Sequence, residues 1–195
     1  KERHFTARRV VGADGASSLV RRTFYREPKT RYTAIQQWFP AGENRAPFYS
    51  CIFDPVTSES CSWIIRKDDT LIFGGCFSPQ DSREAYNRQK SRLEEYLGHS
   101  LGRRIKTEAC QAVRPRGFSD FITGRDGVYL IGEAAGFISA SSFEGISSAI
   151  RSGSALAEAM SQADDDRELA RFYRRKTTSL RLKLWLKTIK RWFMY

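Results

Sequence analysis

Two glycine-containing turns in the sequence each place a carboxylate directly after a short apolar stretch. Asp14 lies between Gly12 and Gly15 in VVGADGASSLVR, and Glu133 follows Gly132 in YLIGEAAGF. A carboxylate in such a position can accept hydrogen bonds from the hydroxyls of a sugar, and a glycine lets the backbone approach a ligand closely. The two turns therefore favour cofactor binding. We assign no catalytic residue from the sequence.

A helix is expected to begin after each turn and to add an anion-binding element. Ser17 or Ser18 can cap a short helix through Arg22, whose first N–H groups would face an anion such as pyrophosphate. A second helix is predicted over Glu144–Met160, and Gly145 lies at its positive end. An Asp-Gly turn before a capped helix, or small residues that pack a helix, would explain parts of this pattern without a ligand. The acid that directly follows the second apolar stretch is not explained in that way.

Between the two turns the sequence predicts an antiparallel sheet with one helix. The strand-like stretches are rich in aromatic and β-branched residues and are separated by Pro and Gly. The helix is predicted to start at Ser78-Pro79 and to have one apolar face. That face comprises Tyr86, Gln89, Leu93 and Tyr96 or Leu97. The strands predicted along the whole chain are 3–11, Tyr32–Phe39, Phe48–Phe53, Cys61–Arg66, Thr70–Phe77, Ile105–Val113 and Val128–Ile131.

The order of these elements predicts a mixed α+β and α/β fold in which an insert interrupts one domain. The segments 1–22 and 117–163 are expected to form the nucleotide-binding type of domain. The insert of antiparallel sheet would cover 23–116. A last helix is expected to start near Asp164 and to continue through the basic segment 164–195.

The net charge of +11 is concentrated near the C-terminus. Residues 171–195 contain nine Lys or Arg and no acidic residue, whereas the first 170 residues contain 24 basic and 22 acidic side chains. This near balance gives no support to nucleic-acid binding by the body of the protein. Four cysteines without a CxxC pair and only two histidines predict reduced thiols and no metal site.

Residues 180–195 have the pattern of a basic, aromatic, amphipathic helix, and no stretch of the chain is long and apolar enough to predict a transmembrane helix. The helix pattern suits a membrane surface that contains anionic lipid, so we expect a cytoplasmic protein that can bind peripherally at the inner face of the membrane. A helix packed on the body of the protein, or a docking helix for a partner, would fit the same pattern. The predicted apolar face comprises Leu182, Leu186, Ile189 and Phe193, flanked by Trp185 and Trp192.

GADGASSLVRR resembles the DG motif of the FAD-dependent oxidoreductases with the para-hydroxybenzoate-hydroxylase fold. GVYLIGEAAGFISASSFEGISSAIRSG is similar to the GD motif of this superfamily together with its flavin-facing helix. The superfamily usually has Asp where this chain has Glu133, a Pro in the loop 137–142, and Gly-Glu-Gly where this chain has Phe143-Glu144-Gly145. The resemblance implies FAD as the cofactor, with contacts from Asp14, Gly15, Gly132, Glu133, Ala134, Gly136, Gly145 and Ile146.

Between these motifs, CSWIIRK resembles the geranylgeranyl-reductase pattern Tyr-x-Trp-x-Phe-Pro-Lys. Trp63 matches the Trp and Lys67 the Lys, whereas Cys61, Ile65 and Arg66 replace the Tyr, Phe and Pro. The resemblance implies that Trp63 and Lys67 contribute to the site of an apolar substrate. A tryptophan packed in the core of the sheet fits the same strand equally well.

The GxGxxG fingerprint, which binds the ADP half of FAD in this superfamily, does not occur in the sequence. We therefore expect the chain to be part of a longer protein in which that unit lies upstream. By itself the chain is expected to bind FAD weakly or not at all.

The resemblance implies a flavin-dependent reductase of an isoprenoid or similar apolar chain, with an electron donor such as NAD(P)H or ferredoxin. A flavin-dependent monooxygenase or halogenase on the same fold is an alternative. A non-catalytic binding or scaffold protein that kept the fold and lost the cofactor is an alternative of a different class.

Overall fold

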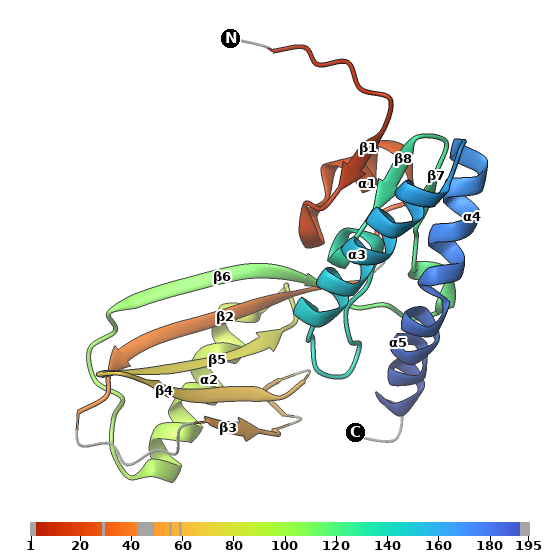
Figure 1. Cartoon of the computed structure of the whole chain (residues 1–195). Coiled ribbons are helices and arrows are strands. Elements are labelled where there is room, and N and C mark those ends of the chain that lie inside the picture. The colour runs from red at the N-terminus through yellow and green to blue at the C-terminus, as the bar shows by residue number, and fades with distance from the viewer. Residues whose placement is uncertain (1–2, 29, 43–48, 55, 59, 192–195) are drawn as a thin grey trace. The chain divides into compact units, whose positions relative to one another are not determined.

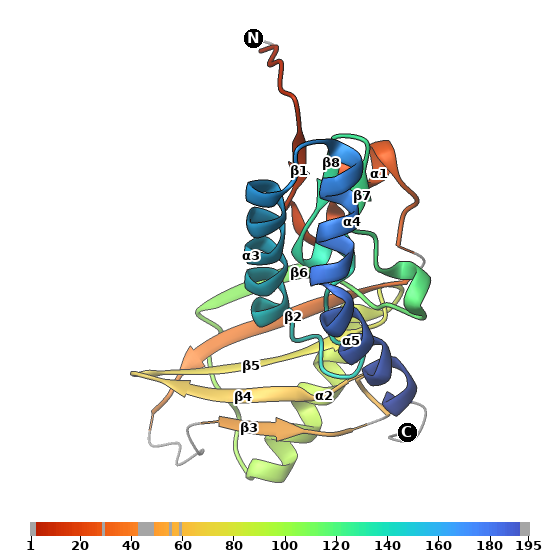
Figure 2. The ribbon, with the colours of Figure 1, turned by 45° about the vertical axis from the view of Figure 1, so that its right-hand side comes forward.

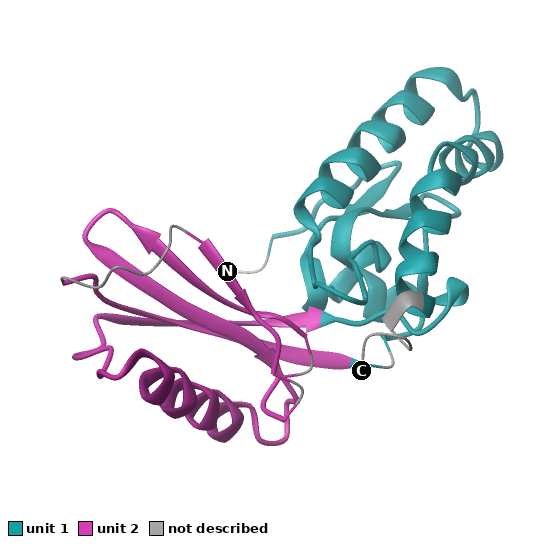
Figure 3. Ribbon diagram, turned by 90° about the horizontal axis from the view of Figure 1, so that it is seen from below, with its two compact units in different colours: residues 1–30, 113–195 teal, residues 31–112 magenta. Residues whose placement is uncertain are grey.

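The computed structural model describes residues 3–28, 30–42, 49–54, 56–58 and 60–191, without the side chains of 190 and 191. The chain forms two compact units, which are coloured separately in Figure 3. Unit 1 comprises Lys1–Thr30 and Val113–Tyr195, and unit 2 comprises Arg31–Ala112. Unit 2 is therefore an insert between the two segments of unit 1, and its limits lie inside the expected 23–116.

Unit 1 contains a small mixed sheet with the strand order β1-β8-β7. β1 (Val10–Gly12) pairs in parallel with β8 (Val128–Leu130), and β7 (Gly124–Arg125) pairs antiparallel with β8. Because Gly12 is opposite Leu130, the turns that follow the two parallel strands leave the sheet at the same edge. The prediction of a strand from residue 3 is wrong, since residues 3–9 pair with no other described segment and form no strand.

Helices surround this sheet and supply most of the core of unit 1. Figure 1 and Figure 2 show α3 and α4 lying side by side. The core includes the buried side chains of Tyr129 and Leu130 from the sheet and of Tyr173 from α4. The Tyr173 hydroxyl donates a 2.8 Å hydrogen bond to the carbonyl of Leu130, which ties α4 to the central strand. The helical elements are η1 (Gly15–Ser17), α1 (Leu19–Phe24), η2 (Phe118–Asp120), η3 (Gly132–Ala135), α3 (Ile146–Gln162), α4 (Asp166–Lys176) and α5 (Thr178–Arg191).

The prediction of a single C-terminal helix is wrong, because the chain forms two helices that meet at Thr177. The Thr177 hydroxyl donates to the carbonyl of Tyr173, and Arg181 Nη2 donates to the carbonyl of Arg174 at 2.7 Å. These bonds satisfy carbonyls at the end of α4 and allow the helix to stop there. On α5, Leu180 and Leu184 are buried, whereas the predicted apolar face at Leu182, Leu186 and Ile189 is exposed. Trp192 and Phe193 of that face lie outside the described residues.

Unit 2 is a five-stranded sheet with the order β3-β4-β5-β2-β6. Figure 1 shows α2 (Ser82–Leu97) along one side of it. Alternate side chains point to that helix, so that Ile64 and Phe73 pack with Tyr86 and Leu93 in the core of unit 2. The expected mixed fold with an inserted antiparallel sheet is confirmed. The strands are β2 (Arg31–Pro40), β3 (Tyr49–Ile52), β4 (Ser62–Lys67), β5 (Thr70–Phe77) and β6 (Lys106–Val113).

The helix of unit 2 begins later than the sequence indicates. Its N-cap is Asp81, and Ser78 hydrogen-bonds the side chain of Gln80 in the preceding turn instead of capping the helix. Of the predicted apolar face, Gln89 is buried, whereas Tyr96 is 87% exposed. In the described ranges, no helix of either unit combines the length and the apolar character needed to cross a bilayer.

Candidate cofactor site

The carboxylate of Asp14 points into its own turn. Oδ1 accepts a 2.5 Å hydrogen bond from the Ser18 hydroxyl, and Oδ2 accepts from the backbone N–H groups of Leu19 at 2.7 Å and Val20 at 3.2 Å. Partial burial tends to raise the pKa of Asp14, but these hydrogen bonds outweigh it and the pKa is lowered. Asp14 therefore fixes the turn as an ionised group at the start of α1. Its predicted contact with a cofactor stays a prediction.

The carboxylate of Glu133 is half-buried and has one oxygen available. Oε1 accepts a 2.7 Å hydrogen bond from the backbone N–H of Val113, while Oε2 has no hydrogen-bond partner among the described residues. Burial raises the pKa of Glu133, and the bond from Val113 opposes that shift only in part. Oε2 can therefore accept a bond from a ligand hydroxyl.

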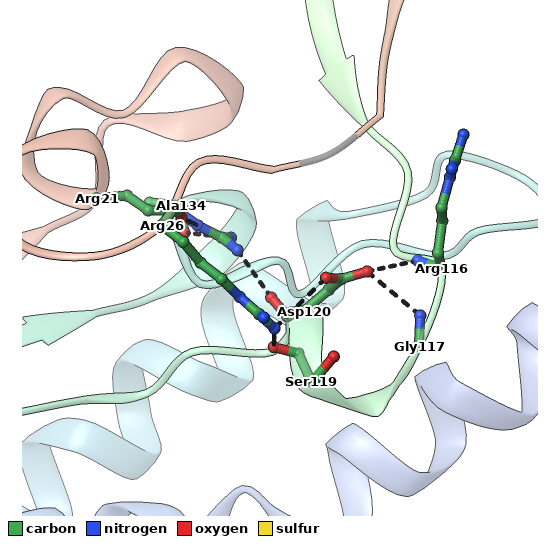
Figure 4. A network of polar contacts seen from close by, with 7 residues as sticks. All are labelled: Arg21, Arg26, Arg116, Gly117, Ser119, Asp120 and Ala134. Carbon is green, nitrogen blue, oxygen red and sulfur yellow. Dashed lines mark hydrogen bonds and ion pairs between the residues drawn. The ribbon is translucent and has the colours of Figure 1, made fainter.

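The two turns are joined directly by Arg21, the arginine of the first motif (Figure 4). This side chain is only 1% exposed. Its Nη1 donates to the carbonyl of Ala134 in the second motif at 3.0 Å, and its Nη2 donates to the carbonyl of Asp120 at 3.0 Å. Its Nε donates to the carbonyl of Arg26 at 3.1 Å. A buried cation that bonds three carbonyls from three segments fixes the distance between the two turns.

Asp120 organises the same network from the other side. Its Oδ2 accepts from the backbone N–H groups of Arg116 at 2.7 Å and Gly117 at 3.3 Å, and its Oδ1 lies 3.8 Å from Arg26 Nη2 (Figure 4). The carbonyl of Asp120 is thus presented to Arg21 by a segment whose own backbone is fixed.

A cavity of about 370 Å³ lies where the two turns meet the start of α3. Its volume is in the range of about 300–1,000 Å³ that is typical of small-molecule sites. The predicted site residues on its wall are Gly15, Gly132, Glu133, Gly145 and Ile146. The wall also contains Ala13, Ile131, Ile138, Phe143 and Ala149, which the sequence did not identify as site residues.

Three predicted contact residues do not line this cavity. Asp14 is directed into its own turn, as described above. The side chain of Ala134 is buried, and its backbone carbonyl accepts a hydrogen bond from Arg21. Gly136 ends η3 with a φ of +83°, and a Cβ there would lie 2.7 Å from the carbonyl of Asp120. Gly136 therefore permits the close packing behind the turn.

Three features of the wall are compatible with the flavin and ribityl part of FAD, the cofactor that the sequence resemblance implies. Gly15 has a φ of +70°, and a Cβ there would have no atom within 4 Å, so the turn is open at this point. Glu133 Oε2 offers an acceptor for a hydroxyl, and the 17-residue helix α3 directs its positive end toward the wall through Gly145 and Ile146.

Phe143 on the wall is supported from behind by Arg114, a residue that the sequence did not identify. Arg114 is 1% exposed, donates from Nε to the carbonyl of Ala140 at 2.8 Å, and lies 5.0 Å from the ring centroid of Phe143. Phe143 has a φ of +54°, an uncommon conformation for a bulky residue. In the sequence, Arg114 only follows the predicted strand Ile105–Val113 and precedes a proline. Its burial is visible only in the tertiary structure.

Glu144 places a negative charge at the start of α3. Its Oε1 accepts from the Ser147 hydroxyl at 2.8 Å and from the Ser147 N–H at 3.2 Å, and the hydroxyl bond in particular lowers the pKa of Glu144. This carboxylate partly offsets the positive end of the helix dipole.

In unit 2, Trp63 lies on the sheet face opposite α2. Its register partner is Gly74, and a Cβ on Gly74 would lie 2.7 Å from the Trp63 ring, so the indole packs directly against this glycine. Its Nε1 donates to Gln36 Oε1 at 3.3 Å. The Lys67 ammonium lies 5.8 Å from the ring centroid of Trp38 on the same face.

Trp38 belongs to a polar cluster on this open face that the sequence did not reveal. The Glu108 carboxylate accepts from Lys106 Nζ at 2.5 Å, from Gln36 Nε2 at 2.6 Å and from Trp38 Nε1 at 2.9 Å. These three hydrogen bonds, that of Lys106 first, lower the pKa of Glu108 to about 2. The cluster therefore fixes both indoles around an ionised carboxylate.

Comparison with known proteins places this geometry in a known fold. No protein-family profile matches the chain. Protein CbrA of Escherichia coli O6:H1 is 45% identical over 190 residues, which cover 97% of this chain and 51% of CbrA. The chain therefore spans about half the length of the curated relatives it matches.

Among solved structures, a geranylgeranyl bacteriochlorophyll reductase-like protein from Thermoplasma acidophilum superposes with a TM-score of 0.73 at 16% identity, over 96% of this chain and 49% of that one. A probable FAD-dependent monooxygenase from Pseudomonas aeruginosa superposes with a TM-score of 0.61 at 18% identity, over 91% of this chain and 53% of that one. The chain thus has the fold of FAD-dependent oxidoreductases.

Proposed function

We propose that the chain supplies the flavin-contacting segments and the substrate sheet of an FAD-dependent reductase that transfers hydride to an isoprenoid or similar apolar chain. The observation that supports this most directly is that residues of both turns and the start of α3 line one shared cavity, among them Gly15, Gly132 and Glu133. The resemblance of both turns to the DG and GD motifs, and the flavoprotein fold, point the same way.

When bound, FAD would supply hydride from its reduced form, and the protein would supply position and polarity. Gly15 and Gly132 leave room for the cofactor to approach the backbone. Glu133 Oε2 would accept a hydrogen bond from a ribityl hydroxyl and so orient the chain of the cofactor. The first turn of α3 would favour negative charge at the flavin edge, and Glu144 would moderate that effect.

The substrate side of the proposal rests on the open face of the sheet in unit 2. Trp63 and Trp38 offer flat apolar surface, and their N–H groups are bonded to Gln36 and Glu108. Indoles whose polar atoms are already satisfied can contact an apolar chain without leaving a donor unpaired. Lys67 would provide a cation for a polar end of the substrate.

The test uses the full-length parent protein. The purified protein is reduced without oxygen by NADPH or by reduced ferredoxin, and geranylgeranyl diphosphate is added. We expect stoichiometric flavin absorbance, reoxidation of the flavin by the substrate, and a product heavier by two hydrogens in mass spectrometry. Flavin reoxidation only by oxygen, with an oxygenated or halogenated product, would support the monooxygenase or halogenase alternative instead.

The variant Glu133→Gln examines the site itself. Gln keeps an acceptor for the Val113 N–H and loses the charged acceptor at Oε2, so FAD binding should weaken about tenfold, the equivalent of one charge-assisted hydrogen bond. Glu158→Gln, at an exposed position of α3 outside the cavity, should leave FAD affinity unchanged. A folded parent protein that binds no flavin would overturn the proposal and favour a non-catalytic protein.

A further inference from the structure

Unit 1 has a second, larger cavity that the proposed flavin site does not use. Its volume is about 610 Å³, and it is formed by η2, the β7 segment, α4 and α5. It shares no lining residue with the cofactor cavity. Its wall comprises Tyr25, Phe118, Ser119, Phe121, Ile122, Thr123, Gly124, Arg125, Ala170, Arg171, Arg174 and Arg181.

The wall of this cavity is strongly cationic. It contains four arginines and no acidic residue. Two of them have acidic partners outside the wall: Arg125 lies 3.4 Å from Asp126, and Arg171 lies 3.2 Å from Glu168. Arg174 and Arg181 form no ion pair with any described residue. The cavity therefore has an excess of positive charge that the described part of the chain does not balance.

Arg181 is the most unusual of the four because it is only 5% exposed. Its Nε is buried and has no hydrogen-bond acceptor among the described residues. Burial, and then the neighbouring charge of Arg174, lower the pKa of Arg181. Arginine remains protonated in proteins, so this side chain is a buried cation without a counter-ion.

The contacts of Arg181 within the protein satisfy only part of its guanidinium group. Its Nη2 donates to the carbonyl of Arg174 at 2.7 Å and to the Thr178 hydroxyl at 3.3 Å, and its guanidinium lies 5.1 Å from the ring centroid of Phe118. These contacts fix the guanidinium in the wall of the cavity. They leave Nε without an acceptor and the charge without an anion.

We propose that this cavity binds a phosphate group. A multiply charged oxyanion would neutralise Arg174 and Arg181 together, and guanidinium groups match the geometry of phosphate oxygens. The hydroxyls of Ser119 and Thr123 on the same wall are further potential donors. The phosphate can come from a soluble phosphate compound or from the headgroup of an anionic lipid, which would reach the cavity beside the exposed apolar residues of α5.

The test compares Arg174→Gln with a matched control in the full-length parent protein. Arg174 is exposed, so its replacement should leave the fold intact. The control is Arg167→Gln, which removes the same charge from an exposed position of the same helix outside the cavity. One arm titrates inorganic pyrophosphate by calorimetry. The other measures flotation with phosphatidylcholine vesicles with and without phosphatidic acid, at two salt concentrations.

We expect Arg174→Gln to weaken binding about tenfold or more, as for the loss of a charge-assisted hydrogen bond, with the control within twofold of the wild type. Binding of pyrophosphate identifies a soluble ligand. Binding only to vesicles with phosphatidic acid identifies a lipid headgroup. Equal loss in both variants would show general charge attraction and overturn the proposal, as would the absence of binding in both arms.

Arg181→Gln is a second variant that separates binding from folding. Without a ligand it loses its contacts with the end of α4, so its melting temperature can fall. Pyrophosphate or phosphatidic acid should raise the melting temperature of the wild type and of Arg167→Gln, but not that of Arg181→Gln. An equal rise in all three proteins would contradict a phosphate site at Arg181.

Discussion

Replacement of Arg21 by methionine should separate the two cofactor turns and strongly destabilise unit 1. The guanidinium donates to the carbonyls of Ala134, Asp120 and Arg26 at 3.0, 3.0 and 3.1 Å, and it is almost fully buried. Methionine is shorter than arginine and has no donor, so the buried carbonyls of Ala134 and Asp120 and the partly buried bond to Arg26 lose this partner. A buried acceptor left unsatisfied costs about 1–3 kcal/mol, so the two buried carbonyls together cost about 2–6 kcal/mol.

We therefore expect Arg21→Met to lower the free energy of unfolding by about 2–6 kcal/mol, a large part of the about 5–15 kcal/mol of a typical domain. The assay is urea unfolding of the full-length parent protein at a fixed FAD concentration, followed by circular dichroism and by tryptophan fluorescence. Arg21→Lys keeps the charge and some of the bonds and should lose about half as much. Arg22→Met, at the neighbouring exposed position, should change the free energy by about 0.5 kcal/mol or less. A loss below about 1 kcal/mol in Arg21→Met would refute the view that this residue clamps the two turns.

Three more predictions concern Glu133, Gly136 and the C-terminal helix. Burial raises the pKa of Glu133 above its ordinary value of 4.5, so the folded protein binds a proton more tightly than the unfolded one, and the wild type loses stability as the pH rises above that value. Gln does not titrate, so Glu133→Gln should gain stability relative to the wild type as the pH rises in thermal melts, and a pH-independent difference would contradict this. Gly136→Ala should lower the free energy of unfolding by about 1–3 kcal/mol, because φ at this residue is +83° and the new Cβ would lie 2.7 Å from the carbonyl of Asp120. If chemical denaturation finds no loss of stability, the turn can relax and this prediction is wrong. Removal of residues 180–195 should abolish salt-sensitive co-sedimentation with anionic vesicles if the C-terminal helix binds membranes, and equal binding by both forms would remove that idea.

The sequence by itself determined the two turns and the elements around them. Interactions between neighbouring residues fix these features. Glycine permits a positive φ at Gly15, Ser18 caps α1, and the apolar and aromatic residues of Thr70–Phe77 favour a buried strand. The resemblance to a flavoprotein superfamily rests on the residues of these two turns and of the helices that follow them. The fold class was therefore predictable, whereas the start of α2 and the break at Thr177 depended on side-chain bonds that local patterns do not reveal.

Only the tertiary structure decided what each charged residue does. Asp14 and Glu133 look equivalent in the sequence, yet one carboxylate is consumed by its own turn and the other keeps a free oxygen at a cavity. Arg21 and Arg181 look like ordinary surface cations in a basic chain, yet one clamps two turns and the other is buried without a counter-ion. The burial of a charged side chain and its hydrogen-bond partners come from segments far apart along the chain. Both determine the pKa of that side chain and its interaction energy with other groups. For that reason spacing and composition predicted the scaffold of this protein, and its electrostatics emerged only once the chain was folded.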